Sequence, residues 1–145
     1  MTTVAIDANV ALALVVPLPY SDRVVQLFTG WQARAVQLAV PALWGYEVAS
    51  ALRKAVTAGV FTLEDAVTAV RHLWALNLQE VPGTIERHRR ALTWAEQLGQ
   101  AVAYDAQYLV VAEELKIPFW TADRSLAAGA QAAGADWVHW IGLSG

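Results

Sequence analysis

The chain has 145 residues, of which 57% are hydrophobic and 16% charged, and this composition excludes intrinsic disorder and predicts one folded domain over residues 1–145. No apolar run reaches the roughly 18 residues that span a membrane, and no secretory signal is expected at the first residues, so we expect a cytoplasmic protein. Cysteine is absent, so we expect neither disulfides nor thiolate chemistry. A net charge of −3 argues against broad electrostatic binding of nucleic acid, which would have to be held locally or through bound cations.

Short apolar runs alternate with helical segments along the chain. Strands are expected at residues 3–6, 35–40, 78–81, 118–121 and 137–141. Helices are expected at residues 10–16, 21–31, 43–58, 62–76, 84–98, 103–115 and 125–133. The expected helix caps are Ser21, Thr62 and Thr84, and the expected glycine stops are Gly59, Gly99 and Gly134. This alternation predicts a three-layer α/β/α domain with a central, mainly parallel sheet.

Four acidic residues fall at the carboxyl ends of the predicted strands, where parallel α/β sheets place their ligand sites. Asp7 follows the first strand and Asp123 follows the strand at 118–121. Glu47 lies in the first turns of the helix after the second strand, and Asp105 begins the helix at 103–115. All four are therefore expected at one edge of the sheet.

Carboxylates that lie close together repel one another, and the remedies are shared protons or bound divalent cations. Few basic residues accompany these acids in the sequence, which favours cations. There is no cysteine, and the three histidines lie on unrelated elements, so an all-oxygen site for Mg²⁺ or Mn²⁺ is favoured over zinc. Such a site suits attack of water on a phosphodiester.

Each acid also has a purely structural interpretation. Asp7 could cap the following helix, and Asp105 could complement the dipole of its own helix. Glu47 could be a solvated helix residue, although its neighbours are apolar, and Asp123 could pair with Arg124 in a turn. The convergence of all four at one edge favours a functional site.

Two further features have structural explanations. The seven tryptophans favour core packing over a base-stacking platform, although their number suggests that some line a protein interface. The basic run from Arg87 to Arg90 is typical of a solvated helix start, with RNA contact as the alternative.

Three segments of the sequence resemble the motifs of PIN-domain ribonucleases, and in particular the small VapC-type toxins of toxin–antitoxin pairs. The first is Val4-Ala5-Ile6-Asp7-Ala8-Asn9-Val10, and the second is Tyr46-Glu47-Val48-Ala49-Ser50-Ala51-Leu52. The third and most specific runs from Tyr104-Asp105-Ala106-Gln107 to Pro118-Phe119-Trp120-Thr121-Ala122-Asp123. Ala8 and Ser50 depart from the hydroxyl residue and the asparagine that are frequent at these positions of the family.

The resemblance covers nearly the whole chain and implies a PIN-like fold and a Mg²⁺- or Mn²⁺-dependent endoribonuclease. Its acidic site would comprise Asp7, Glu47, Asp105 and Asp123, of which Asp7 and Asp105 would be the firmest metal ligands. Asn9 and Thr121 would orient the carboxylates. Toxins of this kind form homodimers and are silenced by a small antitoxin, so both partners are implied, besides an RNA substrate.

Other classes fit less well. An aspartyl phosphotransferase or a phosphoryl-receiver module needs a lysine near its carboxylates, and the only lysines are Lys54 and Lys116. A free-standing PIN nuclease of RNA processing and a non-catalytic binding domain stay open. The sequence does not name the RNA target, the cleavage site or the antitoxin.

Overall fold

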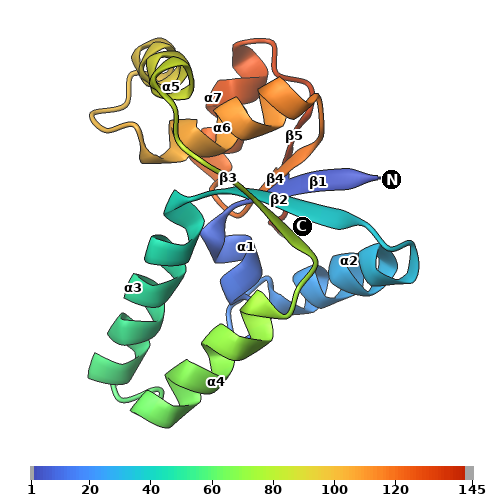
Figure 1. The fold of residues 1–145 in the computed structure, drawn as a ribbon, viewed down its shortest axis with the longest axis vertical. Helices are drawn as coiled ribbons and strands as arrows, with labels where there is room; N and C mark the ends of the chain where they lie inside the picture. The colour runs from blue at the N-terminus through green and yellow to red at the C-terminus, as the bar shows by residue number, and fades with distance from the viewer. Residues whose placement is uncertain (1, 143–145) are drawn as a thin grey trace.

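A five-stranded parallel sheet forms the centre of the computed structural model, which describes residues 2–142 (Figure 1). Met1 and residues 143–145, which the predicted 1–145 domain includes, lie outside the described residues. The strands are β1 (Thr3–Ile6), β2 (Gln37–Pro41), β3 (Leu78–Val81), β4 (Phe119–Thr121) and β5 (Val138–Trp140). They lie in the order β3-β2-β1-β4-β5, and every pairing in the described sheet is parallel.

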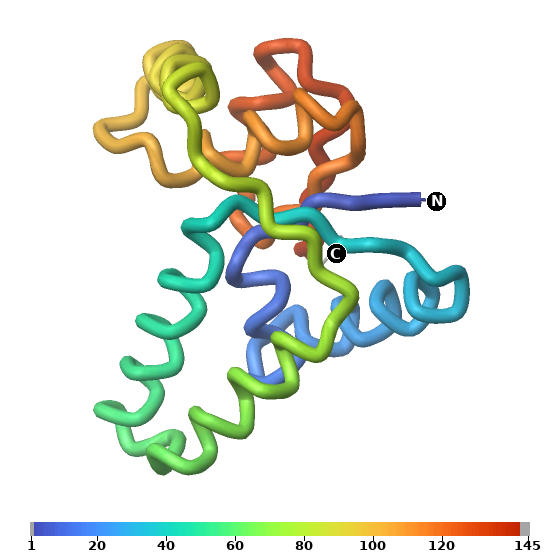
Figure 2. Tube along the Cα trace, in the orientation of Figure 1, coloured from blue at the N-terminus to red at the C-terminus, as the bar shows by residue number. Residues whose placement is uncertain are grey.

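Helices cover both faces of this sheet (Figures 1 and 2). One face carries α5 (Ile85–Leu98), α6 (Tyr104–Leu115) and α7 (Arg124–Ala132). The other carries α1 (Ala8–Leu12), α2 (Ser21–Ala33), α3 (Leu43–Thr57) and α4 (Leu63–Trp74), of which α3 and α4 form a hairpin that extends away from the sheet. The predicted three-layer α/β/α class is confirmed.

The central strand β1 explains why the apolar runs are continuous rather than alternating. Ala5 pairs with Ala39 of β2 on one side and with Phe119 of β4 on the other, and all three are buried. Because both faces of the sheet are covered, inward and outward side chains alike must be apolar.

Most of the tryptophans belong to the core, as favoured from the sequence. Six of the seven lie in three aromatic pairs, which are Trp44 with Trp74, Trp31 with Trp120, and Trp94 with Trp137. In the first pair the ring centroids are 4.9 Å apart, and Trp44 is buried whereas Trp74 is 49% exposed. Packing therefore accounts for the pairs, with Trp74 as the tryptophan most open to solvent.

Helix ends follow the predicted caps in most places. Thr62 caps α4 and forms a capping box with Asp65, and Thr84 caps α5. Gly99 ends α5 with φ of 67°, a left-handed conformation that glycine adopts without a steric penalty. The strands β1 and β3 have the predicted bounds, and the ends of the other elements after the first helix differ from the predicted ones by at most two residues, since such ends fray.

Two expectations near the N-terminus are wrong. The helix predicted at 10–16 begins at Ala8 and ends at Leu12, because Asp7 caps it and turns replace it thereafter. Ser21 is the first residue of α2 and not its cap. Its hydroxyl instead accepts a hydrogen bond from the Leu18 N–H and donates one to the Val16 carbonyl, so it closes the preceding turn.

Within residues 2–142, no helix combines the length and the apolar character that crossing a membrane requires.

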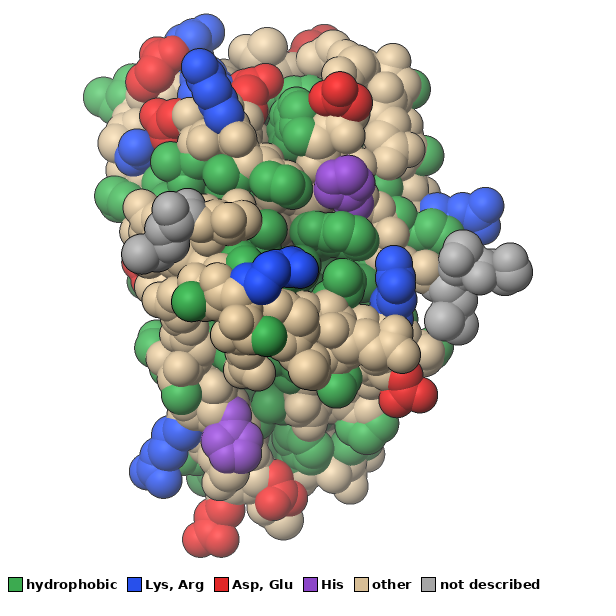
Figure 3. Space-filling view, turned by 90° about the vertical axis from the view of Figure 1, so that its right-hand side faces the viewer, with side chains coloured by type: hydrophobic (Ala, Val, Ile, Leu, Met, Phe, Trp, Pro, Cys, Tyr) green, Lys and Arg blue, Asp and Glu red, His purple; other side chains and the backbone are tan. Residues whose placement is uncertain are grey.

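Figure 3 shows the side of the molecule on which β1 begins, and there acidic and basic side chains are interspersed rather than separated.

Candidate functional site

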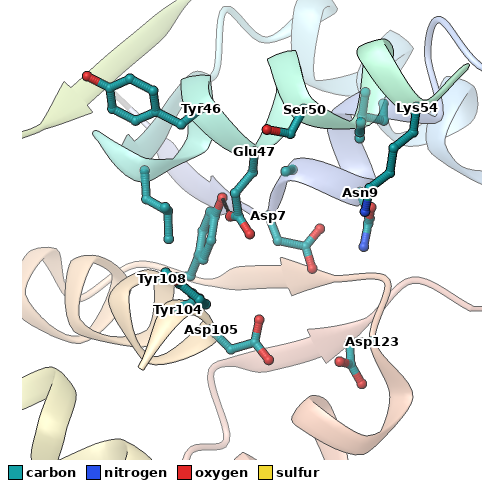
Figure 4. Close-up of a pocket in the computed structure, with 14 residues that line it drawn as sticks. Asp7, Asn9, Tyr46, Glu47, Ser50, Lys54, Tyr104, Asp105, Tyr108 and Asp123 are labelled. Atoms are coloured by element: carbon teal, nitrogen blue, oxygen red, sulfur yellow. Dashed lines mark hydrogen bonds between the residues drawn. The ribbon is translucent and has the colours of Figure 1, made fainter. Parts of the chain in front are cut away.

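The four acids singled out in the sequence line one cavity at the carboxyl edge of the sheet (Figure 4). The cavity measures about 440 Å³ and is called the acidic cavity below. Asp7 follows β1, Glu47 belongs to α3, Asp105 lies in the first turn of α6, and Asp123 follows β4. The predicted convergence of these residues is confirmed in space.

Asp7 is the most firmly held of the four carboxylates. Its Oδ1 accepts a hydrogen bond from the Val10 N–H at 2.9 Å, which caps α1. Its Oδ2 accepts from the Thr121 hydroxyl at 2.5 Å and from the Ala122 N–H at 3.2 Å. Asp7 is thus both a helix cap and a cavity residue, and Thr121 contacts it where the resemblance implies an orienting role, which stays a prediction.

Burial dominates the protonation of Asp7, which is only 8% exposed. Loss of solvation raises the pKa of Asp7 from 3.8 to about 6, although its three hydrogen bonds act in the opposite direction. Repulsion from Asp105 raises it further. An anion held this way is stabilised when a cation enters the cavity.

Glu47 is held by a residue that the sequence did not single out. The Tyr108 hydroxyl donates to Glu47 Oε1 at 2.6 Å, and Oε2 has no partner among the described residues. Burial, and next repulsion from Asp105, raise the pKa of Glu47, while the Tyr108 hydrogen bond lowers it. Burial also raises the pKa of Tyr108, so the phenol stays a donor. In the sequence, the signal for Tyr108 was its spacing of three residues from Asp105, which places both side chains on one face of α6.

Asp105 and Asp123 complete the site. Gln100 donates to Asp105 Oδ2 at 3.3 Å, and burial followed by repulsion from Asp123 raises the pKa of Asp105. Asp123 Oδ1 accepts from the Leu126 N–H at 3.0 Å and caps α7. No ion pair joins Asp123 to Arg124 in the described part of the chain, and Arg124 lies over the Trp140 ring instead.

Five more polar or exposed side chains border the acidic cavity, namely Asn9, Tyr46, Ser50, Lys54 and Tyr104. Asn9 is exposed, and the orienting role implied for it stays a prediction, because its side chain forms no hydrogen bond with the four carboxylates in residues 2–142. The sequence pointed to few basic neighbours, and Lys54 is the one that the described cavity contains.

The basic run at 87–90 does not line this cavity. Arg87 pairs with Glu114 at 2.8 Å, Arg89 pairs with Glu86 at 2.5 Å, and Arg90 pairs with Glu113. These arginines are already paired with glutamates of α5 and α6, and Arg87 and Arg90 are only partly exposed, which supports the structural interpretation over RNA contact.

The donor set of the acidic cavity fits a hard divalent cation. Glu47, Asp105 and Asp123 are each held at one oxygen while the other stays open, whereas Asp7 is held at both. Burial, reinforced by repulsion between the acids, raises the pKa of Asp7, Glu47 and Asp105. Across residues 2–142, no three His, Cys, Asp or Glu side chains lie close enough together to coordinate a metal ion by themselves. This arrangement still suits Mg²⁺, which is usually held by one or two carboxylates and keeps several water ligands.

No protein-family model and no curated protein sequence matches the chain. Solved structures do match over nearly its whole length. The PAE2754 protein of Pyrobaculum aerophilum is 25% identical, with a TM-score of 0.67, over 97% of this chain and 84% of that one. A chain of the Klebsiella pneumoniae toxin–antitoxin complex is 14% identical, with a TM-score of 0.68, over 96% of this chain and 98% of that one. A chain of VapBC2 from Rickettsia felis, bound to a DNA fragment from its promoter, is 11% identical, with a TM-score of 0.66, over 96% and 97%.

These matches confirm, at the level of the fold, the resemblance to VapC-type PIN-domain proteins that the three sequence motifs indicate. The chain has the fold of components of toxin–antitoxin complexes.

Proposed function

We propose that this chain is a Mg²⁺- or Mn²⁺-dependent endoribonuclease and the toxin of a VapBC-type toxin–antitoxin pair. One observation carries the proposal: four carboxylates from four separate elements meet in one cavity, and no ion pair neutralises any of them in the described residues. Like charges in a partly buried place are costly unless shared protons or a bound cation offset them, and the proposal assigns that part to a bound cation.

The residues of the cavity would share the work of holding the ion and the substrate. Asp7 and Asp105 would be the firmest ligands, with Glu47 and Asp123 completing the site directly or through water. A bound divalent cation supplies charge neutralisation for the phosphodiester and lowers the pKa of a water that attacks it.

The hydrogen bonds around the acids would fix their geometry before substrate arrives. Thr121 and the backbone at Val10 and Ala122 hold both oxygens of Asp7, and Tyr108 holds one oxygen of Glu47. Preorganised carboxylates do not have to reorient during the reaction, which lowers its barrier.

The proposal includes two protein contacts, a cognate antitoxin and a second copy of the chain. Two separate helix faces expose apolar side chains. Leu63, Val67 and Trp74 lie on one side of α4, and Ile85 and Leu92 lie on one side of α5. Such faces are typical of protein interfaces. Matches to chains of toxin–antitoxin complexes support the antitoxin as one partner.

Cleavage of RNA by the purified chain, measured in EDTA and then with Mn²⁺ or Mg²⁺ restored, tests the nuclease. We expect no cleavage in EDTA and recovery with either cation. Asp136→Asn is the matched control for Asp105→Asn, because Asp136 is exposed and does not line the acidic cavity. Cleavage that persists in EDTA, or equal activity of the two variants, would contradict the proposal. Complete inactivity with every RNA would favour a non-catalytic binding domain.

A growth assay distinguishes a toxin from a free-standing PIN nuclease of RNA processing. Expression of the chain alone should arrest growth, and Asp105→Asn should relieve the arrest. Normal growth during expression of an active nuclease would favour the RNA-processing enzyme.

A further inference from the structure

A single basic side chain enters the acidic cavity in the part of the chain that the structure describes. Glu47, Ser50 and Lys54 all line it from α3. Their spacing of three and then four residues places them on one face of the helix. In Figure 4 the Lys54 side chain extends from α3 toward Asn9 of α1, on the far side of the cavity from Tyr46.

Lys54 has no carboxylate partner within residues 2–142, although four carboxylates share its cavity. It differs in this from Arg87, Arg89 and Arg90, each of which pairs with a glutamate. Its place in the last turn of α3 lets it complement the helix dipole. That role requires no approach to the cavity, so it does not explain why the side chain lines it.

The distance along α3 separates Lys54 from the acids. Seven residues at 1.5 Å each place the Lys54 backbone about 10 Å from that of Glu47 along the helix axis. A phosphate held at the acids and an anion held by Lys54 are therefore different groups. A nucleic acid strand supplies both, because its phosphates recur along the backbone.

We infer that Lys54 binds a phosphate of single-stranded RNA next to the phosphate that lies at the acids. This inference rests on the proposed nuclease function and deepens it. A single strand is favoured because Asp7 lies 8% exposed within a cavity of about 440 Å³, which a flexible strand enters more readily than a rigid duplex.

The chemistry of lysine suits this role. An ammonium group on a flexible stem binds phosphate as a point charge and needs no fixed geometry. Because the chain carries a net charge of −3, attraction for RNA must come from a local cationic side chain in addition to the metal. The exposed Asn9 side chain, toward which Lys54 extends, adds amide donors to the same part of the cavity.

The test measures binding of a fluorescent ten-nucleotide oligouridylate in EDTA, as a function of salt. An Asp105→Asn background prevents cleavage and removes one of the four negative charges. We expect Lys54→Ala to weaken binding about fivefold at low salt and to reduce the slope of log K against log salt by about 0.7, the value for one phosphate contact on a single strand. Lys54→Arg should keep the slope.

Arg53→Ala is the matched control, since Arg53 is the exposed neighbour on α3, has no ion pair in the described residues and does not line the cavity. An unchanged slope in Lys54→Ala, an equal change in Arg53→Ala, or no measurable binding by the Asp105→Asn protein would overturn the inference. Thermal unfolding of each variant checks that the fold persists. Binding that depends on Lys54 in a chain that cleaves no RNA would retain this inference and reject the nuclease.

Discussion

Two groups of charged side chains on this molecule behave in opposite ways. Between α5 and α6, arginines of one helix pair with glutamates of the other, as with Arg87 and Glu114 or Arg90 and Glu113. In the acidic cavity, four carboxylates face one another and no arginine or lysine pairs with them in the described structure. The charged side chains of α5 and α6 neutralise one another in ion pairs, whereas the carboxylates of the acidic cavity form none in the described structure.

The contrast extends to protonation. Arg89, by its hydrogen bond and its charge, holds the pKa of Glu86 below the ordinary value. Burial raises the pKa of Asp7, Glu47 and Asp105 above theirs, and mutual repulsion adds to it. Perturbed carboxyl groups of the second kind concentrate at functional sites, because a stable fold gains nothing from them.

The largest difference between the two groups should appear in catalysis. Replacing Asp105 by asparagine removes a predicted metal ligand, so cleavage of RNA in Mn²⁺ should fall at least about a hundredfold. Glu113→Gln removes one surface charge from a paired arginine and should keep wild-type activity. Initial cleavage rates of the three proteins provide the measurement. Similar losses in both variants would remove the distinction between cavity and surface.

The hydrogen bond from Tyr108 to Glu47 should matter less than a metal ligand but still measurably. Tyr108→Phe keeps the ring, which stacks near Phe119, and deletes only the donor at 2.6 Å. We expect a loss of activity of about tenfold, typical of a residue that orients a ligand, together with a weaker dependence on Mn²⁺. Unchanged rates at every Mn²⁺ concentration would show that Glu47 does not need this support.

Stability without metal should rise when a charge leaves the cavity. The pKa of Asp7 is about 6 in the folded chain, against an ordinary value of 3.8, so the folded chain binds the proton more tightly than the unfolded chain does. Lowering the pH from 7 toward 4 in EDTA should therefore stabilise the wild type, chiefly around pH 6 and below. Asp7→Asn should lack most of this gain and, at pH 7, melt about 3 °C higher, or about 1 kcal/mol more stable.

The gain in Asp7→Asn is modest because an amide supplies only one acceptor oxygen for three donors. Thermal melts of both proteins in EDTA between pH 4 and pH 8 measure it. A variant less stable than the wild type at pH 7 would identify Asp7 as a structural cap alone.

The smallest effect is expected on the paired surface. Glu113→Gln breaks an ion pair whose side chains are partly exposed, so the free energy of unfolding should change by less than about 1 kcal/mol. Urea unfolding of the variant and the wild type measures the difference. A larger loss would mean that the α5–α6 pairs hold the fold, and the contrast with the cavity would have to be redrawn.

Sequence patterns predicted the parts of the fold that depend on local chemistry. The capping threonines, the glycine at 99 and the continuous apolar strands placed most elements, and strand ends placed the four acids at one edge. Ser21 was misassigned because its hydroxyl bonds backward into a turn, which residue type alone does not distinguish from capping.

The positions of two cavity residues could not be predicted from the sequence, because they depend on tertiary packing. Tyr108 reaches Glu47 across 61 positions of sequence, and Lys54 enters the cavity only because α3 turns that face toward α1. Pairings over such separations are set by the packing of helices on the sheet, and a single sequence does not encode them as a local pattern.

Calorimetric titration with Mn²⁺ at pH 7 and pH 5 tests most directly whether the acidic cavity holds a cation. Because ligand carboxylates must be deprotonated, binding by the wild type should release protons and weaken at pH 5, below the pKa of about 6 at Asp7. Asp136→Asn should bind as the wild type does, and Asp105→Asn should bind at least about tenfold more weakly. Equal Mn²⁺ affinity of all three proteins, or affinity that does not change with pH, would contradict a metal site at these four carboxylates.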